Sequence, residues 1–337
     1  MSAPMSAATT IGVFDSGVGG LTVLRALRAR LPDYSFLYLG DSARLPYGTK
    51  SADTVRRYAL QAASVLVSRD VQALVVACNT ASAVALDDLA ARWPSLPVLG
   101  VIEPGARAAV AKTRNGCIGV IGTESTIRGE AYQRAIDALA PSVGMPLRVH
   151  ARACSVFVAL AEEGWFDTPA AEAVARAYLQ DWFDTPAAEA EAVARAGAHP
   201  DTHANTQAGT YADSGIRGHA DTHADSSIGA DSDARAGHRA ANETLVPDTL
   251  VLGCTHFPVL REVIGRVVGP AVTLVDSATT TAEALAQRLG ATRASVASSP
   301  RGRLGLLATD GPERFAAVGS RFMGEFITPE QVEIVDL

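Results

Sequence analysis

The sequence predicts an α/β protein of two similar α/β domains with largely parallel sheets and an active site in the cleft between them. Strand-like apolar runs alternate with helix-like segments through short loops, the pattern of parallel sheets. Two apolar runs end in a cysteine followed by polar residues, Cys78-Asn79-Thr80 and Cys254-Thr255-His256. Because α/β folds bind ligands at the carboxyl ends of their strands, we expect both thiols to face one pocket.

The elements of the first half follow one another closely. Strands are expected at 11–15, 35–40, 73–77 and 98–102. Helices are expected at 21–31, 52–68 and 80–93, the last capped by Thr80 or Ser82. Each strand therefore returns to the sheet through a helix or loop, as parallel pairing requires.

The second half repeats this rhythm. Strands are expected at 118–122, 147–150, 249–253, 272–275, 303–309 and 332–335, and helices at 127–139, 155–163, from 259 and at 312–321. We expect a flexible N-terminus over 1–9. We assign domain A to 10–104 and 277–337, and domain B to 105–276.

The segment from about 165 to 244 interrupts the pattern. Residues 165–173 recur identically at 182–190, a local duplication and not a solenoid period. Residues 197–242 contain no Leu, Val, Phe or Trp, so they are expected to form a disordered insertion. Five of the seven histidines lie there. A metal-binding tract is the alternative, but no cysteines or fixed spacing accompany them, which favours a polar repeat expansion.

Composition excludes several classes. The 337 residues carry a net charge of −7 without a Lys/Arg-rich run, which argues against nucleic-acid and anionic-membrane partners. The N-terminal segment does not resemble a secretory signal and no apolar run spans a bilayer, so a cytoplasmic location is expected. The four cysteines should then be reduced. Pyridoxal phosphate needs a lysine for its Schiff base, and neither of the two lysines, Lys50 and Lys112, lies in a segment expected to be catalytic. No cofactor is therefore expected.

The segments Cys78-Asn79-Thr80 and Cys254-Thr255-His256, here called the two cysteine corners, are candidates for thiol chemistry. A helix beginning near Thr80 would direct free N–H groups at Cys78, and we expect the same geometry at Cys254, with His256 able to polarise a thiol or relay a proton. Cys117 and Cys154 lack such partners and are expected in the core. A metal site is the competing interpretation, but the usual paired-ligand spacings are absent, so no metal is expected.

A glycine-rich turn, Asp15-Ser16-Gly17-Val18-Gly19-Gly20, follows the first strand. It lacks the spacing of a dinucleotide or Walker motif, so a carboxylate suits it better than phosphate. A plain capped turn is the alternative for the glycines. In the second half, Thr123 and Thr126 flank the analogous turn and either bind a carboxylate or act as ordinary caps.

With these corners in place, the chain resembles the cofactor-independent glutamate racemases of the aspartate/glutamate racemase family. The matching segments occur in the family's order, and any one alone would be weak. They are 14–21, 40–41 with 45–48, 77–81, 100–104, 122–126, 154–164 and 253–258. The resemblance spans the chain except the first ten residues and the insertion.

The resemblance implies an isomerase that interconverts L- and D-glutamate, with two thiols on opposite faces of the α-carbon. By position, Cys78 corresponds to the base for D-glutamate and Cys254 to the base for L-glutamate, with Asp15, His256 and Glu162 as auxiliary acid–base residues. The implied substrate-binding positions are Asp15, Ser16, Pro46, Tyr47, Gly48, Asn79, Thr80, Thr123, Thr126, Thr255 and His256.

The biological role implied is the supply of D-glutamate for peptidoglycan and hence for cell-wall biogenesis and cell shape. A homodimer is expected, with glutamate as its small-molecule ligand. The alternatives are an aspartate or hydantoin racemase of the same architecture, or a non-catalytic binding protein that kept the pocket.

Overall fold

The computed structural model of the chain describes residues 9–183, 245–291 and 302–337. The insertion at 197–242, with its histidines, and the N-terminus up to residue 8 lie outside the described residues. Thr9, the last residue of the expected flexible N-terminus, is buried, and its carbonyl accepts a hydrogen bond from Ser35 N–H. Apart from Leu245, the described residues belong to one compact unit.

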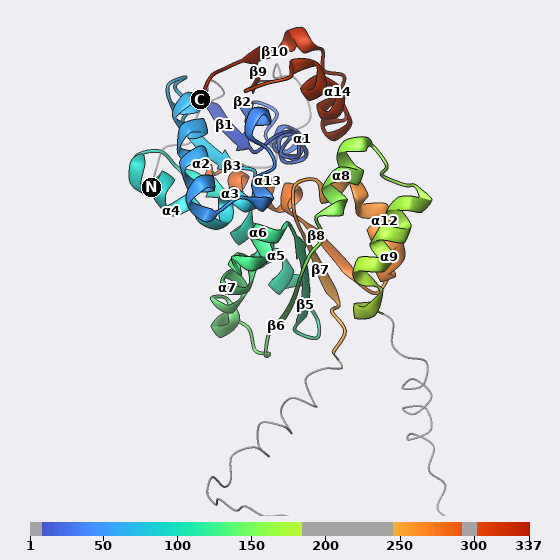
Figure 1. Cartoon of the computed structure of the whole chain (residues 1–337). Helices are drawn as coiled ribbons and strands as arrows, with labels where there is room; N and C mark the ends of the chain where they lie inside the picture. Colours follow the sequence, from blue (N-terminus) through green and yellow to red (C-terminus); the bar gives the residue numbers. More distant parts are fainter. Residues whose placement is uncertain (1–8, 184–244, 292–301) are drawn as a thin grey trace, which may run out of the picture. The chain divides into compact units, whose positions relative to one another are not determined.

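A six-stranded parallel sheet contains both ends of the described chain (Figure 1). Its strand order is β10-β9-β2-β1-β3-β4, with every pair parallel. The strands are β1 (Thr10–Asp15), β2 (Ser35–Gly40), β3 (Ala73–Val76), β4 (Val98–Gly100), β9 (Leu304–Ala308) and β10 (Val332–Ile334). Phe14 pairs with Val76, so Asp15 and the segment after β3 leave the sheet at the same edge.

A second parallel sheet has the order β6-β5-β7-β8. Its strands are β5 (Cys117–Gly122), β6 (Arg148–Ala153), β7 (Thr249–Gly253) and β8 (Thr273–Asp276). Gly122 pairs with Gly253, so Thr123 and Cys254 leave this sheet at the same edge. The predicted fold, two α/β halves with parallel sheets, is confirmed.

Helices connect the strands (Figure 1). They are α1 (Leu21–Arg30), α2 (Ala52–Val67), α3 (Asn79–Val84), α4 (Leu86–Arg92), α5 (Ile102–Lys112), α6 (Glu124–Arg128), α7 (Ala131–Asp137), α8 (Val156–Glu163), α9 (Pro169–Phe183), α12 (Arg261–Val268), α13 (Ser277–Arg288) and α14 (Pro312–Met323). Short 3-10 helices occupy Ser42–Arg44, Tyr47–Thr49, Ala140–Ser142, Phe257–Leu260 and Pro329–Gln331. α13 packs on both α1 and α5 and so joins the layers of the two sheets.

Several predicted boundaries are wrong, each for a local reason. The strand expected at 98–102 ends at Gly100, and an unpredicted helix, α5, follows with Pro104 in its first turn. Proline is tolerated in a first helical turn, where its missing N–H has no intrahelical acceptor. The helix expected at 127–139 begins at Glu124 and is divided at Glu130, whose φ is 49°.

The cap expected at Thr80 or Ser82 is instead Cys78, since α3 begins one residue after it. Two further helices, α9 and α13, were not predicted. α9 lies in the segment where the strand–helix rhythm stopped, but Ala171, Ala175 and Leu179 recur every four residues and bury one helical face.

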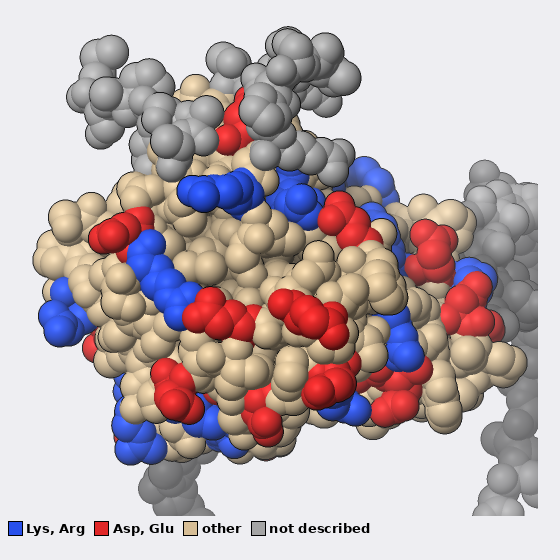
Figure 2. Space-filling view, turned by 90° about the horizontal axis from the view of Figure 1, so that it is seen from above, with Lys and Arg blue, Asp and Glu red and all other residues tan. Residues whose placement is uncertain are grey.

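Acidic and basic side chains are intermixed on the face shown in Figure 2. Many of the charges are paired on the surface, as Arg28 with Glu325 and Arg69 with Glu333. None of the helices in the described ranges is long and apolar enough to cross a membrane.

Candidate active site

Polar loops at the carboxyl ends of both sheets enclose a pocket with a volume of about 270 Å³. Cys78 follows β3 in the first sheet and Cys254 follows β7 in the second, and both thiols line this pocket. The remaining lining residues are Ser16, Leu45, Pro46, Tyr47, Gly48, Thr49, Asn79, Thr80, Thr123, Ser155, Val158, Ala159, Glu162, Thr255 and His256. The sequence prediction that the two thiols face one pocket is confirmed.

Cys78 is the N-terminal cap of α3. Its Sγ accepts a hydrogen bond from Ala81 N–H at 3.4 Å and lies 3.5 Å from Ser16 Oγ, to which the thiol donates. Burial raises the pKa of the Cys78 thiol to about 12, and the negative charge of Asp15 acts in the same direction. The contacts with Ser16 and Ala81 oppose the rise without cancelling it. The resting side chain near neutral pH is therefore a thiol, the form that delivers a proton.

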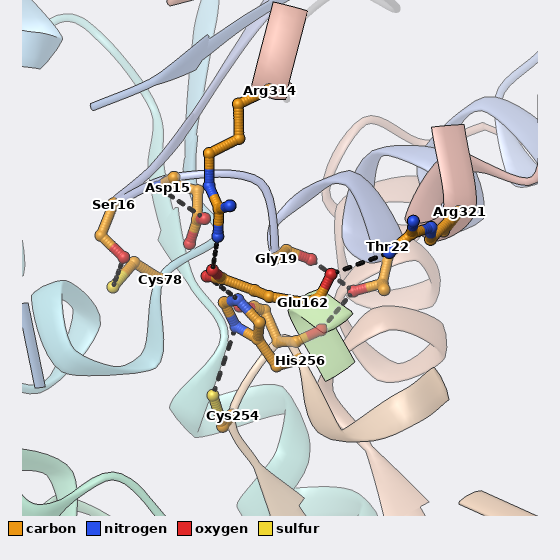
Figure 3. A network of polar contacts seen from close by, with 12 residues as sticks. Asp15, Ser16, Gly19, Thr22, Cys78, Glu162, Cys254, His256, Arg314 and Arg321 are labelled. Atoms are coloured by element: carbon orange, nitrogen blue, oxygen red, sulfur yellow. Dashed lines mark hydrogen bonds and ion pairs between the residues drawn. The ribbon is translucent and has the colours of Figure 1, made fainter. Parts of the chain in front are cut away.

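Cys254 has different neighbours, although the sequence predicted the same geometry. The next helical turn is the 3-10 helix Phe257–Leu260, and within the described chain the contact of Cys254 Sγ is His256 Nδ1 at 3.8 Å. The other ring nitrogen, Nε2, lies 3.2 Å from Glu162 Oε1 (Figure 3). A carboxylate and a thiol therefore contact opposite sides of one buried imidazole.

This arrangement keeps His256 protonated. Burial alone disfavours the imidazolium, but the contacts with Cys254 and Glu162 outweigh it and raise the pKa of His256 to about 10. In turn, the hydrogen bond from His256 lowers the pKa of Glu162. The imidazolium is a proton donor beside Cys254, so a proton can pass between ring and thiol.

Asp15 is fully buried and does not line the pocket. Its Oδ2 accepts a hydrogen bond from Gly17 N–H at 3.0 Å, whereas Oδ1 has no hydrogen-bond partner among the described residues. Burial raises the pKa of Asp15, and the charge of His256 opposes that rise. Asp15 does not line the pocket, but its negative charge, when present, raises the pKa of both Cys78 and His256.

The glycine-rich turn touches the second cysteine corner directly. A Cβ added at Gly19 would lie 2.4 Å from His256 Nδ1, so this close approach excludes any side chain. Thr22 fastens the contact, because its hydroxyl lies 2.9 Å from both Gly19 O and Thr255 O. The glycine pattern therefore has a packing reason that the sequence alone did not reveal.

Three threonine hydroxyls from the two halves form a cluster at the pocket wall. Thr80 Oγ1 lies 3.0 Å from Thr123 Oγ1 and 3.4 Å from Thr126 Oγ1, and the last two are 3.0 Å apart. Thr80 and Thr123 line the pocket, whereas Thr126 lies behind them. The cluster provides hydroxyl donors suited to a carboxylate.

Asn79 offers a further donor. Tyr132 donates a hydrogen bond to Asn79 Oδ1 at 2.8 Å, and Asn79 Nδ2 is buried without a partner among the described residues. The tyrosine therefore fixes the orientation of the amide, with Nδ2 as its unpaired end. A buried donor of this kind costs free energy unless a ligand satisfies it.

The Tyr47-Gly48 loop is anchored from both halves. Tyr47 donates a hydrogen bond to the buried carboxylate of Asp41. From α6, Ser125 Oγ donates to Gly48 O at 2.7 Å. Thr123 lies against Gly48, where an added Cβ would be 2.8 Å from Thr123 Cβ. Sequence reasoning missed Asp41 and Ser125, although Asp41 belongs to a motif that carried the family resemblance.

The structure brings the predicted site residues together, with Asp15 and Thr126 just behind the wall. Sequence reasoning also missed the pocket residues Leu45, Thr49, Ser155, Val158 and Ala159. A signal existed for two of them, because Ser155 and Ala159 precede Glu162 at helical spacing and share its face. Among the residues that the structure describes, no group of three or more His, Cys, Asp or Glu side chains could hold a metal ion.

Comparisons with known proteins agree with this geometry. Residues 21–199 match the family model described as Asp/Glu/Hydantoin racemase. A glutamate racemase of Geobacter metallireducens is 44% identical over 314 residues, which cover 93% of this chain and 92% of that one.

Two solved structures extend the comparison. Thermus thermophilus glutamate racemase in complex with β-chloro-D-alanine has a TM-score of 0.69 and 38% identity, and the match covers 99% of each chain. Francisella tularensis glutamate racemase in complex with D-glutamate has a TM-score of 0.70 and 29% identity, covering 98% of each chain. The chain belongs to the Asp/Glu/hydantoin racemase family.

Proposed function

We propose that the protein is a glutamate racemase that interconverts L- and D-glutamate by two-base proton transfer. The observation that carries the proposal is the pair of thiols, Cys78 and Cys254, that reach one pocket from two different sheets. The solved relative with bound D-glutamate supports the same substrate for this pocket. Two groups are needed because a single base would return the proton to the face from which it came.

In the direction from L-glutamate, Cys254 as thiolate removes the α-proton. The Cα–H bond breaks, an S–H bond forms, and the electron pair moves into the α-carboxylate. Cys78 then delivers its thiol proton to the opposite face and becomes a thiolate. The reverse reaction begins at Cys78, and the raised pKa of that thiol favours its role as acid in the forward direction.

Pocket donors stabilise the charge that develops on the α-carboxylate. Asn79, Thr80 and Thr123 all line the pocket, and Asn79 Nδ2 is a buried N–H group without a partner among the described residues. Fixed donors of this kind need no reorganisation when charge moves onto oxygen. His256, held between Glu162 and Cys254, supplies or receives the proton that resets the second thiol.

Incubation of the protein with L-glutamate or L-aspartate in deuterated water tests the proposal. The wild-type protein should exchange the α-proton of glutamate, and the optical rotation of the glutamate solution should fall to zero. Aspartate should react little. Cys78→Ser and Cys254→Ser should each abolish racemisation, while Cys117→Ala, a buried thiol at the end of β5 opposite the pocket, should leave it intact. Racemisation unaffected by either active-site change would contradict the mechanism, and faster turnover of aspartate would contradict the substrate.

We also propose a homodimer in the cytoplasm that supplies D-glutamate for peptidoglycan. Trp165 and Phe326, at 51% and 84% exposure, are the first candidates for contacts between the two subunits. The four free cysteines support a reducing compartment. Light scattering tests the dimer, and dependence of growth on external D-glutamate after gene deletion tests the role. We retain 10–104 with 277–337 and 105–276 as the proposed domains.

A further inference from the structure

Given the proposed racemase function, we propose that Arg314 is a positioning residue for the Cys254 half of the reaction, acting through Glu162 and His256. Arg314 lies in the first turn of α14, a helix that packs on the six-stranded sheet through α1 and β10. It does not line the thiol pocket. Its effect on chemistry must therefore pass through the groups that it holds.

The contacts form a continuous chain (Figure 3). Arg314 Nη2 lies 3.0 Å from Glu162 Oε2, and the other carboxylate oxygen lies 3.2 Å from His256 Nε2. The far side of the imidazole then contacts Cys254 Sγ at 3.8 Å. Both oxygens of Glu162 thus have a cationic partner, and the two contacts together set the direction of the carboxylate.

A second arginine fixes the backbone of the same residue. Arg321, two turns further along α14, donates a hydrogen bond to Glu162 O at 2.9 Å. Glu162 lies near the C-terminal end of α8, where carbonyl groups lack intrahelical partners. α14 therefore contacts the main chain and the side chain of Glu162 separately. Only the Arg314 contact reaches the carboxylate, which is also hydrogen-bonded to His256.

This series of contacts leads to Cys254 and not to Cys78. The contacts of Cys78 Sγ are Ser16 Oγ and Ala81 N–H, and neither group is bonded to Glu162 or His256. A change at Arg314 should consequently slow proton transfer at Cys254 more than at Cys78. This asymmetry separates positioning from a general loss of structure.

The charged groups around Glu162 determine how the pKa of its carboxyl responds to a change at Arg314. His256 lowers the pKa of Glu162 first, and Arg314 acts in the same direction. Arg321 contacts the main chain of Glu162. Asp310 and Glu162 both line a second cavity of about 260 Å³. Removing the Arg314 charge raises the pKa of Glu162, so its carboxylate, and with it the contact to His256, is lost at a higher pH.

The exposure of Arg314 limits the size of the effect. Its side chain is 64% exposed, against 17% for Glu162, and exposed ion pairs contribute little. We expect Arg314→Gln to lower kcat by roughly two- to fivefold with KM unchanged. Arg314→Lys retains the charge and should recover part of kcat and the wild-type pH profile. Arg107→Gln, which breaks an ion pair of similar exposure on α5, is the matched control.

Directionality has to be measured with isotopes. The two enantiomers have equal free energy, so kcat/KM is the same in both directions for every variant. If proton transfer at Cys254 is slowed, the isotope effect on kcat/KM rises for the α-deuterated enantiomer that Cys254 deprotonates, expected to be L-glutamate. It falls for the other enantiomer. The acidic limb of the kcat profile should also move to higher pH in Arg314→Gln.

The outcomes separate the two proposals. Wild type that does not racemise glutamate overturns the proposed function itself. With an active wild type, isotope effects in Arg314→Gln that are unchanged from wild type for both enantiomers overturn the positioning role. A change in KM alone also overturns it and points to attraction of the anionic substrate. In a Glu162→Gln background, Arg314→Gln should cause no further loss, and an undiminished loss there also overturns it. Thermal unfolding of each variant identifies losses due to misfolding.

Discussion

Replacing Gly19 by alanine tests the close approach of the glycine-rich turn to the second cysteine corner. The new Cβ would lie 2.4 Å from His256 Nδ1 and 2.6 Å from Thr255 Oγ1, where ordinary contacts begin at 3.4 Å. One side of the contact must therefore move by about 1 Å, the difference between those distances. The turn is held in place by Thr22, which bonds both segments.

We expect any displacement of the His256 imidazole to reduce activity. Its Nε2 is hydrogen-bonded to Glu162, and its ring lies edge to face with Phe322 at 5.3 Å between centroids. A shift of about 1 Å would disturb the contact with Cys254 Sγ, and misplacement of that size can cost about a hundredfold in rate. We expect Gly19→Ala to lower kcat by roughly ten- to a hundredfold and to destabilise the fold by about 1–3 kcal/mol.

Gly17→Ala in the same turn is the matched control. A Cβ at Gly17 would meet Leu45 Cδ2 at 3.5 Å, an ordinary contact. The two variants should be compared by circular dichroism assays of L- and D-glutamate turnover and by thermal unfolding. Gly19→Ala that is folded and as active as Gly17→Ala would refute the claim that this turn positions His256.

Two further changes probe the first cysteine corner and the free amide. The rate of Cys78 alkylation by iodoacetamide, followed by peptide mass spectrometry, should rise about tenfold per pH unit from about pH 7 to 10, because its pKa is raised to about 12; a plateau below pH 9 would show that the thiol ionises normally. Tyr132→Phe removes the donor that orients Asn79 and should raise KM for glutamate roughly fivefold, the effect of about 1 kcal/mol. An unchanged KM would mean that the Asn79 amide does not contact substrate.

Local sequence determines much of this protein. Buried parallel strands need continuous apolar runs, and such runs predicted the strands in nearly their observed positions. The polar residues after 73–77 and 249–253 also predicted a ligand-binding edge on each sheet, but the two strands belong to different sheets, and only the packing of those sheets brings both edges to one pocket. A cysteine followed by amide, hydroxyl or imidazole groups is uncommon in a core, which is why the sequence pattern alone indicated Cys78 and Cys254.

Helix boundaries depended on contacts between distant segments. Trp165-Phe166-Asp167 forms the turn before α9, whereas the identical Trp182-Phe183 is the last turn of that helix. The same two residues adopt different conformations in different surroundings, because Phe166 packs against Phe322 whereas Trp182 packs against His150. α5 was also not predicted, and its Gly105 lies against the ring of Tyr132 from a later part of the sequence.

The sequence by itself determined the alternating fold and the identity of the two thiols, since both follow from patterns within short windows. Only the tertiary structure decided what surrounds each thiol. Cys78 contacts Ser16, whereas Cys254 contacts an imidazole held by Glu162 and, through it, by Arg314. The physical reason is that electrostatic and steric contacts act over a few ångströms in space, and 152 residues of chain separate Glu162 from Arg314.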